Sequence, residues 1–474
     1  MTEILAESKS YTTRKEQWRK IRDAIEGEDQ VKLQGQTYLP KPSGMTVGEY
    51  NNYKQRAMFY SVAERTRRGF LGLIFRQDPI VKVPDSMKEW MKSMTSDGMS
   101  FEMLSDELLG EGVTIGRFGI LPDFSTDAKP NEFPHLVTYL AEDIVDWKEA
   151  MINGKKKLVL VSLRDTVGSH LDAEEEEFLD LTLVDGVYTA QRWKIVSEAG
   201  KEDLRVNLGE PATPTVRGKT LDYIPFNFIN PSDMKPAISK PPFLDLVNMN
   251  MAHYRNSADY EHALYMTAQP TPWVAGVVSE SMKPTSIGPS VIWYLAEGGR
   301  AGYLEFEGKG LEQQRHAMND KEDRMAALGA RMIAESANRN ETVDTARLRG
   351  RGEMSLLKSV VMISSVAMTR VLRTVADWMG LPKDDILVKY NDDFVETRMT
   401  HQEMTAMVSA WQSGAISRFT MHENFQRGEI IDPARTVEEE EADIDEDVLI
   451  NPAPQPQPGD EDDDTGEPPG DDET

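Results

Sequence analysis

Three arginines lie close together in a segment that has no apolar period. Arg347, Arg349 and Arg351 belong to the run NRNETVDTARLRGRGE, whose glycines and polar residues predict a mobile loop. Three like charges at this spacing repel one another unless water, a counter-charge or an anion is near. Guanidinium groups make reversible contacts with phosphate. Two interpretations stay open: a solvated or salt-bridged loop with Asp344 or Glu353 as partner, and a loop that contacts a phosphate backbone.

A pair of neighbouring carboxylates is the second group that could do chemistry. Asp392 and Asp393 end the run YNDD, which matches the Tyr-x-Asp-Asp pattern in which reverse transcriptases hold two metal ions for nucleotidyl transfer. That chemistry needs a third carboxylate on an upstream strand, but the preceding residues predict mostly two helices and a charged loop. The pattern therefore favours a strand followed by a turn, where Asp is common. We do not expect an enzyme.

No metal site or cofactor is predicted. The sequence has no cysteine, and its seven histidines form no HExxH or His-x-His cluster. Asp460, Asp462 and Asp464 are spaced like a calcium loop, but Thr465 stands where glycine is needed. The glycine-rich run GEGVTIGRFGIL follows a predicted helix at residues 101–109 instead of preceding one, which favours a structural hairpin over a phosphate loop.

Net charge limits the partners that the chain can bind tightly. The 474 residues carry a formal charge of −27. Residues 437–474 hold 17 acidic residues and no basic one, which leaves −10 for residues 1–436. An acidic body argues against tight, sequence-specific binding of duplex DNA. The longest uncharged apolar stretch, residues 359–369, is far too short to span a bilayer, so we expect a soluble subunit assembled in the cytoplasm.

The N-terminal half predicts helices followed by an antiparallel sheet. Thr46 and Glu49 form a capping box that opens one helix running to about residue 76. From residue 136 to residue 228 the pattern is β, and the pairs NG at 153–154 and DG at 185–186 supply two-residue hairpin turns.

Two long helices and an apolar helix dominate the C-terminal half. Residues 243–268 and 311–338 have apolar residues at helical spacing, enclose a small β-rich insert, and predict a long antiparallel pair. Residues 354–379 predict a helix that is apolar on nearly all sides, which must be buried in the subunit or against a copy of itself. A strand ILVKY, two helices and an acidic, disordered tail follow.

The order of these elements resembles that of tailed-bacteriophage portal proteins, the head-tail connector family. The resemblance covers about residues 45–430, and it is carried by the order and spacing of several stretches together. These are YKQRAMFYSVAERTRRGFLGLIFRQDP, YIPFNFIN with PPFLDLVNMNMAHYRNSADYEHAL, MAALGARMI, and WQSGAISRFTMHENFQRGEI.

The resemblance implies an α+β portal fold with a mixed wing domain, a two-helix stem, a small α/β clip and a helical crown. The segments would be the N-terminal part and wing at 1–242, stem helices at 243–268 and 311–338, the clip at 269–310, the tunnel loop at 339–353, a wing helix and strand at 354–400, the crown at 401–432 and a disordered acidic tail at 433–474.

The resemblance also implies a function. In this family about twelve subunits form a ring at one capsid vertex, through which DNA is packaged and ejected. The implied partners are double-stranded DNA, terminase, capsid and scaffolding proteins, and head-completion or tail adaptor proteins, and the location is the virion. An acidic wall would keep DNA mobile in such a channel. Another ring or adaptor protein of the capsid is the structural alternative.

Three groups of residues follow as site predictions. The DNA-contacting loop would hold Arg347, Arg349 and Arg351. The oligomer interface would hold Leu357, Val361, Val366, Leu311, Met318 and Met325, and the clip surface for partners would hold Trp293 and Tyr303.

Overall fold

The computed structural model describes residues 8–124, 133–167, 175–196, 204–268, 271–276, 286, 291–295, 297–304, 309–329, 343–392, 394, 401–428, 430–431 and 435–450. The chain divides into two units, Met1–Phe394 and Val395–Thr474.

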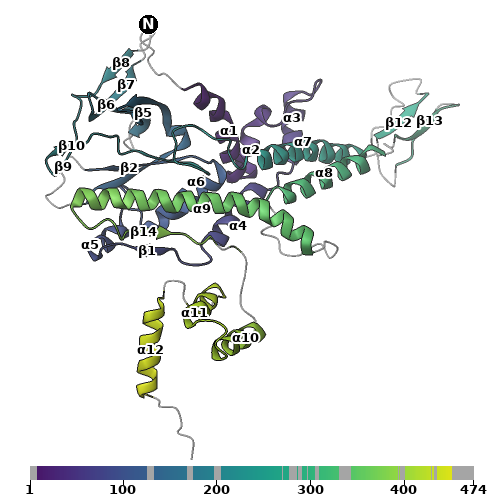
Figure 1. The fold of residues 1–474 in the computed structure, drawn as a ribbon. Coiled ribbons are helices and arrows are strands. Elements are labelled where there is room, and N and C mark those ends of the chain that lie inside the picture. Colours follow the sequence, from purple (N-terminus) through teal and green to yellow (C-terminus); the bar gives the residue numbers. More distant parts are fainter. Residues whose placement is uncertain are drawn as a thin grey trace, which may run out of the picture. The chain divides into compact units, whose positions relative to one another are not determined.

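The helices of the first unit are α1 (Lys9–Glu26), α2 (Glu28–Leu33), α3 (Val47–Arg56), α4 (Val62–Ile74), α5 (Asp85–Lys88), α6 (Phe101–Thr114), α7 (Leu244–Thr267), α8 (Lys309–Ala327) and α9 (Val343–Met379). Its strands are β1 (Ile80–Lys82), β2 (Phe118–Asp123), β3 (His135–Leu140), β4 (Ile144–Ile152), β5 (Lys155–Val167), β6 (Glu175–Val184), β7 (Val187–Val196), β8 (Leu204–Asn207), β9 (Thr215–Val216), β10 (Lys219–Thr220), β11 (Asn227–Ile229), β12 (Thr271–Ala275), β13 (Arg300–Leu304) and β14 (Leu387–Lys389) (Figure 1).

A five-stranded antiparallel sheet, in the order β4-β5-β6-β7-β8, forms one layer of this unit. Its two predicted hairpin turns are confirmed, because β4 joins β5 through Asn153 and Gly154, and β6 joins β7 through Asp185 and Gly186. All four residues have positive φ, between 49° and 80°, as a type I′ turn requires. The inner face packs Leu163 and other apolar residues against the second sheet, β11-β2-β3.

Glycines in α6 allow a close approach between helices. The sequence predicted that this helix ends at residue 109, but it continues through Gly110 and Gly112 to Thr114. A Cβ on Gly110 would lie 2.7 Å from the Arg67 guanidinium, and one on Gly112 would lie 2.8 Å from Val360 of α9. These glycines therefore serve packing and do not break the helix, and the strand of the expected hairpin begins only at Phe118.

The single long helix predicted from residue 46 is two helices. The capping box is confirmed, since the Thr46 side chain accepts from the Glu49 amide while the Glu49 carboxylate accepts from the Thr46 amide. The chain leaves the helical conformation at Ala57, whose ψ is 139°. The freed Met58 amide donates to the Ser257 hydroxyl of α7 at 2.9 Å. Contact with α7 therefore replaces one turn of helix.

A network of charges fastens α1 to the core. The Arg22 guanidinium donates to both oxygens of Glu111 on α6, at 2.9 Å, and to both oxygens of Glu142, at 2.6 and 2.7 Å. Bidentate pairs of this kind are strong and directional. Burial raises the pKa of the neighbouring Glu107 to about 6, and the carboxylates of Glu111 and Asp97 raise it further. Glu107 is thus a half-buried acid that makes no ion pair in this network.

Arg117 is a second charge inside the unit. It is fully buried between the rings of Trp147 and Phe228, at 4.4 and 4.9 Å from their centroids. One amino group donates to the Pro236 carbonyl at 2.9 Å. Desolvation lowers its pKa to about 9, so it is still charged at neutral pH, and the aromatic faces offset part of the cost of burial.

The second unit contains α10 (His401–Gln412), α11 (Arg418–Arg427) and α12 (Val437–Ile450). The first two confirm predicted helices. The third corrects the prediction of disorder for residues 437–450. A capping box joins Thr436 and Glu439, acidic residues occupy the first turn, and Arg418 of α11 pairs with Glu441 at 3.2 Å. Acidic side chains at a helix N-terminus interact favourably with the helix dipole, which composition alone does not reveal.

One helix within the described ranges, Leu356–Met379 of α9, is long and apolar enough by length and composition to cross a membrane. Buried core helices of soluble proteins pass the same test. Here 56% of the tested window is buried inside the unit, and the exposed face carries Arg370 and Arg373, so the evidence for a membrane span is weak.

Substitution of Gly112 tests the close approach of α6 and α9. Alanine normally stabilises a helix interior by about 1 kcal/mol relative to glycine. At Gly112 this gain should be outweighed by overpacking against Val360, which costs about 1–3 kcal/mol, so Gly112→Ala should lower the free energy of unfolding. Gly72 of α4 has open space around it and is the matched control, since Gly72→Ala should raise stability. Urea denaturation of both variants checks this, and equal effects would contradict the packing argument.

Glu107 makes stability depend on pH. Its pKa in the folded protein lies above that of the unfolded chain, so its favourable contribution is complete below about pH 4.5 and is lost as the pH rises through about 6. Glu107→Gln should therefore be more stable than the wild type at pH 7.5, by about 1 kcal/mol after allowance for solvent screening, and no more stable at pH 4.5. Thermal melts at both pH values measure the difference, with Glu16→Gln, at an exposed position of α1, as the control. A gain that is equal at both pH values would disprove this assignment.

Candidate functional site

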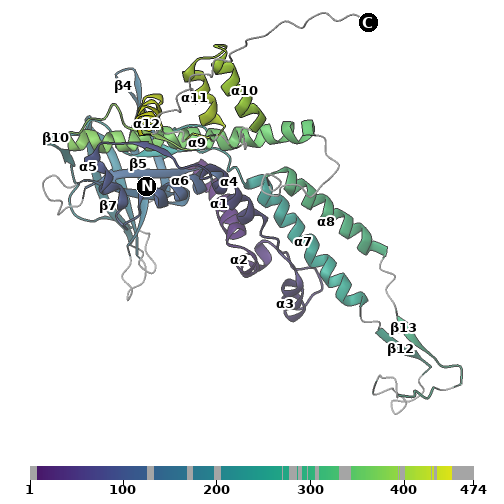
Figure 2. The same cartoon turned by 90° about the horizontal axis from the view of Figure 1, so that it is seen from below.

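Helices α7 and α8 lie side by side and lead to the hairpin β12-β13 (Figure 2). We call these four elements the arm. The predicted first helix is confirmed to within one residue at each end. The second begins at Lys309 and ends at Ala327, and residues 330–338 of the prediction lie outside the described residues. Between α7 and α8, the described residues contain β12 and β13 and no helix, so the α/β character predicted for this insert is not seen there.

Helix α3 of the body holds the C-terminal half of α7, which leads to the hairpin. The Tyr53 hydroxyl donates to the Asp259 carboxylate of α7 at 2.6 Å, and the Tyr53 ring meets His262 edge-on. Arg56 lies over the Tyr265 ring, 3.7 Å from its centroid. Burial, followed by the bond to Asp259, raises the pKa of Tyr53. The direction of α7 is therefore fixed by tertiary contacts, because Tyr53 and Asp259 are 206 residues apart in the sequence.

The seam between the two arm helices is partly polar. His253 of α7 is buried, lies 3.2 Å from a Glu322 carboxylate oxygen of α8, and meets the Tyr60 ring edge-on. Desolvation lowers its pKa. Asn250 donates to the Tyr60 carbonyl at 3.0 Å. Polar groups in a helix pair specify alignment at some expense of stability, so this seam sets the register of α8 on α7.

Aromatic side chains are exposed at the end of the arm. Trp273 of β12 lies opposite Gly302 of β13, where a Cβ would come within 3.2 Å of the indole nitrogen. Tyr303 is 55% exposed and Tyr294 is 78% exposed. Trp293 is half-buried and donates to the Ser286 carbonyl at 2.9 Å. Exposed aromatic residues in such number are typical of protein interfaces.

Helix α9 is the longest in the described chain and packs against α6, β2, β11 and β14. Its exposed positions from residue 358 onward recur every three or four residues and form one stripe: Lys358, Met362, Val366, Arg370, Arg373 and Asp377. The other faces are buried. The sequence prediction that the helix is apolar on nearly all sides is thus corrected, because one of its faces remains accessible and is partly charged.

A ladder of side chains joins α9 to β14. The Ser365 hydroxyl accepts from the Tyr390 amide at 3.1 Å, the Thr369 hydroxyl bonds both the amide and the carbonyl of Val388, and Arg373 donates to the Ile386 carbonyl at 3.1 Å. Four residues of helix rise about 6 Å and two residues of strand span about 6.7 Å, so the two repeats match. The ladder satisfies one edge of β14, while β1 pairs with the other.

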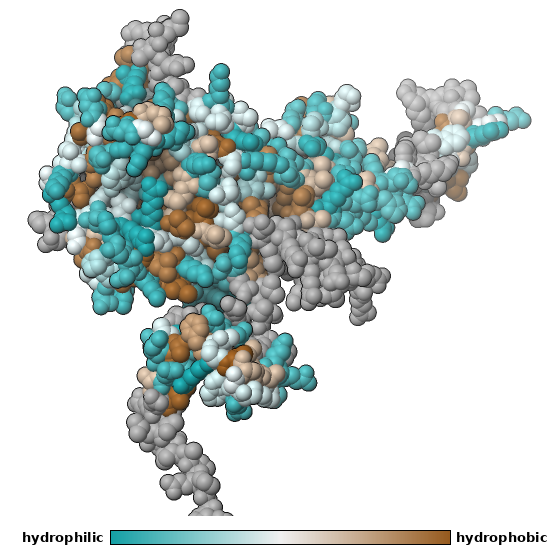
Figure 3. Space-filling view, in the orientation of Figure 1, coloured by the Kyte–Doolittle hydropathy of each residue, from teal (hydrophilic) through white to brown (hydrophobic). Residues whose placement is uncertain are grey.

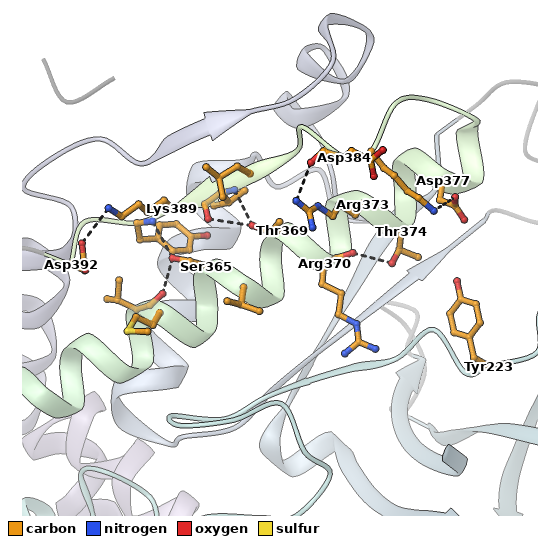
Figure 4. A pocket seen from close by; sticks show the side chains of 17 residues that line it. Tyr223, Ser365, Thr369, Arg370, Arg373, Thr374, Asp377, Asp384, Lys389 and Asp392 are labelled. Carbon is orange, nitrogen blue, oxygen red and sulfur yellow. Dashed lines mark hydrogen bonds and ion pairs between the residues drawn. The ribbon is translucent and has the colours of Figure 1, made fainter. Parts of the chain in front are cut away.

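An open groove of about 790 Å³ runs along this junction (Figure 4). Its walls are the exposed stripe of α9, the segment from Lys383 to Asp392, and Tyr223. Lys383 pairs with Asp377 at 2.5 Å, and Asp392 lies near Lys358 and Lys389, at 3.4 and 3.7 Å. The Arg370 guanidinium makes no hydrogen bond or ion pair with any residue that the structure describes, and Figure 4 shows it without a polar partner.

Comparison with known proteins gives three findings. A family model described as a domain of unknown function, DUF4055, matches residues 242–379, from the start of α7 to the end of α9. No curated protein matches the sequence significantly.

Two solved structures are similar to the chain at a low level. One is the neck of a native GTA particle computed with C12 symmetry, with a TM-score of 0.37 and 12% identity over 82% of this chain and 96% of that chain. The other is the neck of an empty GTA particle computed with C6 symmetry, with the same TM-score and identity over 83% and 96%. A likeness at this level carries no argument about fold or function.

The structure corrects two groups of predicted site residues. Residues 343–353 belong to α9, so Arg347, Arg349 and Arg351 lie in a helix and the predicted loop is wrong from Val343 onward; residues 339–342 lie outside the described residues. Arg and Leu are good helix formers, and two glycines cost only about 1 kcal/mol each. Continuation of the helix that the apolar segment already forms outweighs the free-energy cost of the two glycines.

The predicted interface residues divide by burial. Leu357, Val361 and Met325 are at most 2% exposed, so they are core residues of one subunit and the interface prediction is wrong for them. Val366 is 57% exposed, and Leu311 and Met318 are half-buried on α8. A helical pattern identifies apolar positions, but it does not show which of them the same chain covers.

The segment that leads to the predicted carboxylate pair is held by contacts within the core. The Tyr390 hydroxyl is buried against Ser105, and its ring stacks on Phe101. Asn391 donates to the Leu73 carbonyl, and Asp392 lies between two lysines. Asp393 lies outside the described residues. No group of three His, Asp or Glu side chains within the described ranges is placed to hold a metal.

The ladder residues are not among the residues predicted from the sequence. Ser365, Thr369 and Arg373 are polar residues spaced by four within an apolar helix. That spacing places them on one face and was the available signal. Their target, the edge of β14, follows the helix closely in sequence.

Removal of one hydroxyl tests the ladder. Thr369→Val keeps the shape of the side chain but leaves the buried Val388 amide and carbonyl without their partner, so the free energy of unfolding should fall by about 1–3 kcal/mol. Thr374 on the same helix bonds only the Arg370 carbonyl, so Thr374→Val should change stability by less than about 0.5 kcal/mol. Urea denaturation measures both, and the ladder is refuted if the two variants behave alike.

Proposed function

We propose that the chain is the subunit of a phage portal, a ring at one capsid vertex that forms the channel for DNA packaging and ejection. The observation that carries the proposal is the arm followed by α9. Two adjacent helices enclose a small β hairpin, and a long helix packed across the body comes next. This is the order of stem, clip, stem and wing helix that the sequence resemblance implies. The sheet-containing body would be the wing, and the second unit would be the crown.

We propose the same DNA-contacting role for the three arginines, although they lie in a helix and not in a loop. They belong to the N-terminal part of α9, so the element that contacts DNA in the channel would be the end of a helix. Their contacts would be with phosphate and would read no bases, because arginines at a backbone contact position a duplex without sequence preference. The remaining acidic surface would prevent permanent adhesion.

The end of the arm would be the docking site for other particle proteins. Terminase during packaging, and head-completion or tail adaptor proteins afterwards, would meet the exposed aromatic residues there. Capsid and scaffolding proteins would meet the wing. Large aromatic side chains give such contacts most of their binding energy.

Electron microscopy of the purified full chain tests the oligomer. We expect rings of about twelve subunits with a central hole, because a heterologous interface that closes gives cyclic symmetry. A protein that stays monomeric at every concentration, or that forms open filaments, would contradict the proposal.

Substitution of the arginines tests the channel contact. The triple variant Arg347→Ser, Arg349→Ser, Arg351→Ser should assemble into rings but reduce the DNA packaged or retained in particles. The deficit relative to the wild type should be largest at low salt, because a protein with fewer phosphate contacts depends less on salt. The control is the triple variant of the exposed Arg19, Arg65 and Arg68, which removes the same charge from α1 and α4. DNA retention equal to that of the control across a range of salt would rule out the contact.

A further inference from the structure

The accessible face of α9 is apolar at its centre. Met362 is 54% exposed and Val366 is 57% exposed, and Leu387, across the groove, is 41% exposed. Figure 3 shows hydrophobic side chains gathered on the face across which α9 runs in Figure 1. Isolated apolar residues on a surface need no explanation, but three that line one groove are typical of a contact surface.

The groove does not accept an added strand. The edge of β14 that faces α9 is already satisfied by Ser365, Thr369 and Arg373, so its amides and carbonyls are not available for pairing. An occupant must therefore bind through side chains. The surface it meets is apolar at Met362 and Val366. It ends beside Tyr223 at the Arg370 guanidinium, which has no polar partner among the described residues.

The charge of the groove indicates what fits it. A desolvated guanidinium needs a carboxylate or another acceptor opposite it. This chain has 80 acidic and 53 basic residues, so a second copy offers carboxylates that could lie opposite Arg370. A carboxylate opposite Arg370 would come from a different face of the second copy, so the two faces in contact would not be the same.

The length of α9 points to the same occupant. Its 37 residues span about 55 Å. If its N-terminal arginines reach the channel, the helix runs from the axis outward. Subunits converge toward the axis of a closed ring, so each side of such a helix meets a neighbouring copy. This step rests on the proposed function.

We propose that the groove between the exposed stripe of α9 and the segment from Lys383 to Asp392 is one half of the contact between subunits, and that its occupant is a second copy of this chain. Met362, Val366 and Leu387 make the apolar contact, and Arg370 pairs with a carboxylate of the neighbour. The contact is heterologous, so the groove of one subunit meets a surface of the neighbouring subunit other than its groove.

The absence of cysteine allows a direct test. Val366→Cys places one thiol in the groove, and Met151→Cys places one on β4, where the wild-type residue is 69% exposed. Both variants are assembled into rings and are also kept as dilute, dissociated subunits, and the rate of reaction with a maleimide is measured in each state. The protection of Cys at position 366 on assembly should exceed that at position 151 by about tenfold. A ratio near one overturns the proposal, and so does a thiol at 366 that is already protected in the free subunit.

Insertion of a charged side chain distinguishes an effect on ring assembly from an effect on folding. Val366→Asp should abolish rings while leaving the melting temperature of the subunit within a few degrees of the wild type, because Val366 is exposed in the subunit. Val361→Asp is the contrasting variant. It buries an unpaired charge at a residue that is 1% exposed, so the subunit itself should unfold. A wild-type chain that never forms rings contradicts both proposals, whereas wild-type rings that persist in Val366→Asp contradict only the groove.

Discussion

The matching repeats of α9 and β14 are the constraint on which the rest of the first unit depends. A strand of three residues with a single partner strand would be unstable alone. The side chains of Ser365, Thr369 and Arg373 take the place of a second partner, because four residues of helix and two residues of strand advance by nearly the same distance. The ladder thereby fixes α9 along its length, and α9 in turn covers α6, β2 and β11. Loss of the ladder would free both elements together.

The close approach of α6 extends this constraint. Gly112 allows Val360 to lie where a side chain would otherwise stand, so α6 and α9 pack with little space between them. Through Glu111, one residue earlier, α6 also holds Arg22 and with it α1. A single helix therefore links the N-terminal helix to the long C-terminal one. Loss of any of these contacts should therefore lower the stability of the whole first unit.

The interactions that stabilise the arm differ from those that stabilise the rest of the first unit. Its helices share a narrow seam in which Met325 is buried but His253 faces Glu322. Helix α3 supports the C-terminal half of α7 through Tyr53 and Arg56. Such a pair gains little from burial within one chain. In a ring, neighbouring arms would bury the faces that one subunit leaves open, so the arm would be most stable in the assembly for which we propose it.

Local features of the sequence determined the elements that local physics controls. The Asn-Gly and Asp-Gly pairs specified two hairpins because few other residues adopt positive φ, the Thr46 capping box specified the start of α3, and the apolar period of residues 243–268 specified α7. Tertiary structure decided the rest. Glycines such as Gly110 and Gly112 are common at helix ends, yet both lie within α6. Neighbouring side chains occupy the space that a Cβ at these positions would need. Ala57 has a high helix propensity, yet the helix ends there, because the next amide bonds to α7. The apolar positions of α9 were evident in the sequence, but only packing separates the buried Val361 from the exposed Val366, since periodicity is a property of one helix and burial depends on what the remaining chain brings against it.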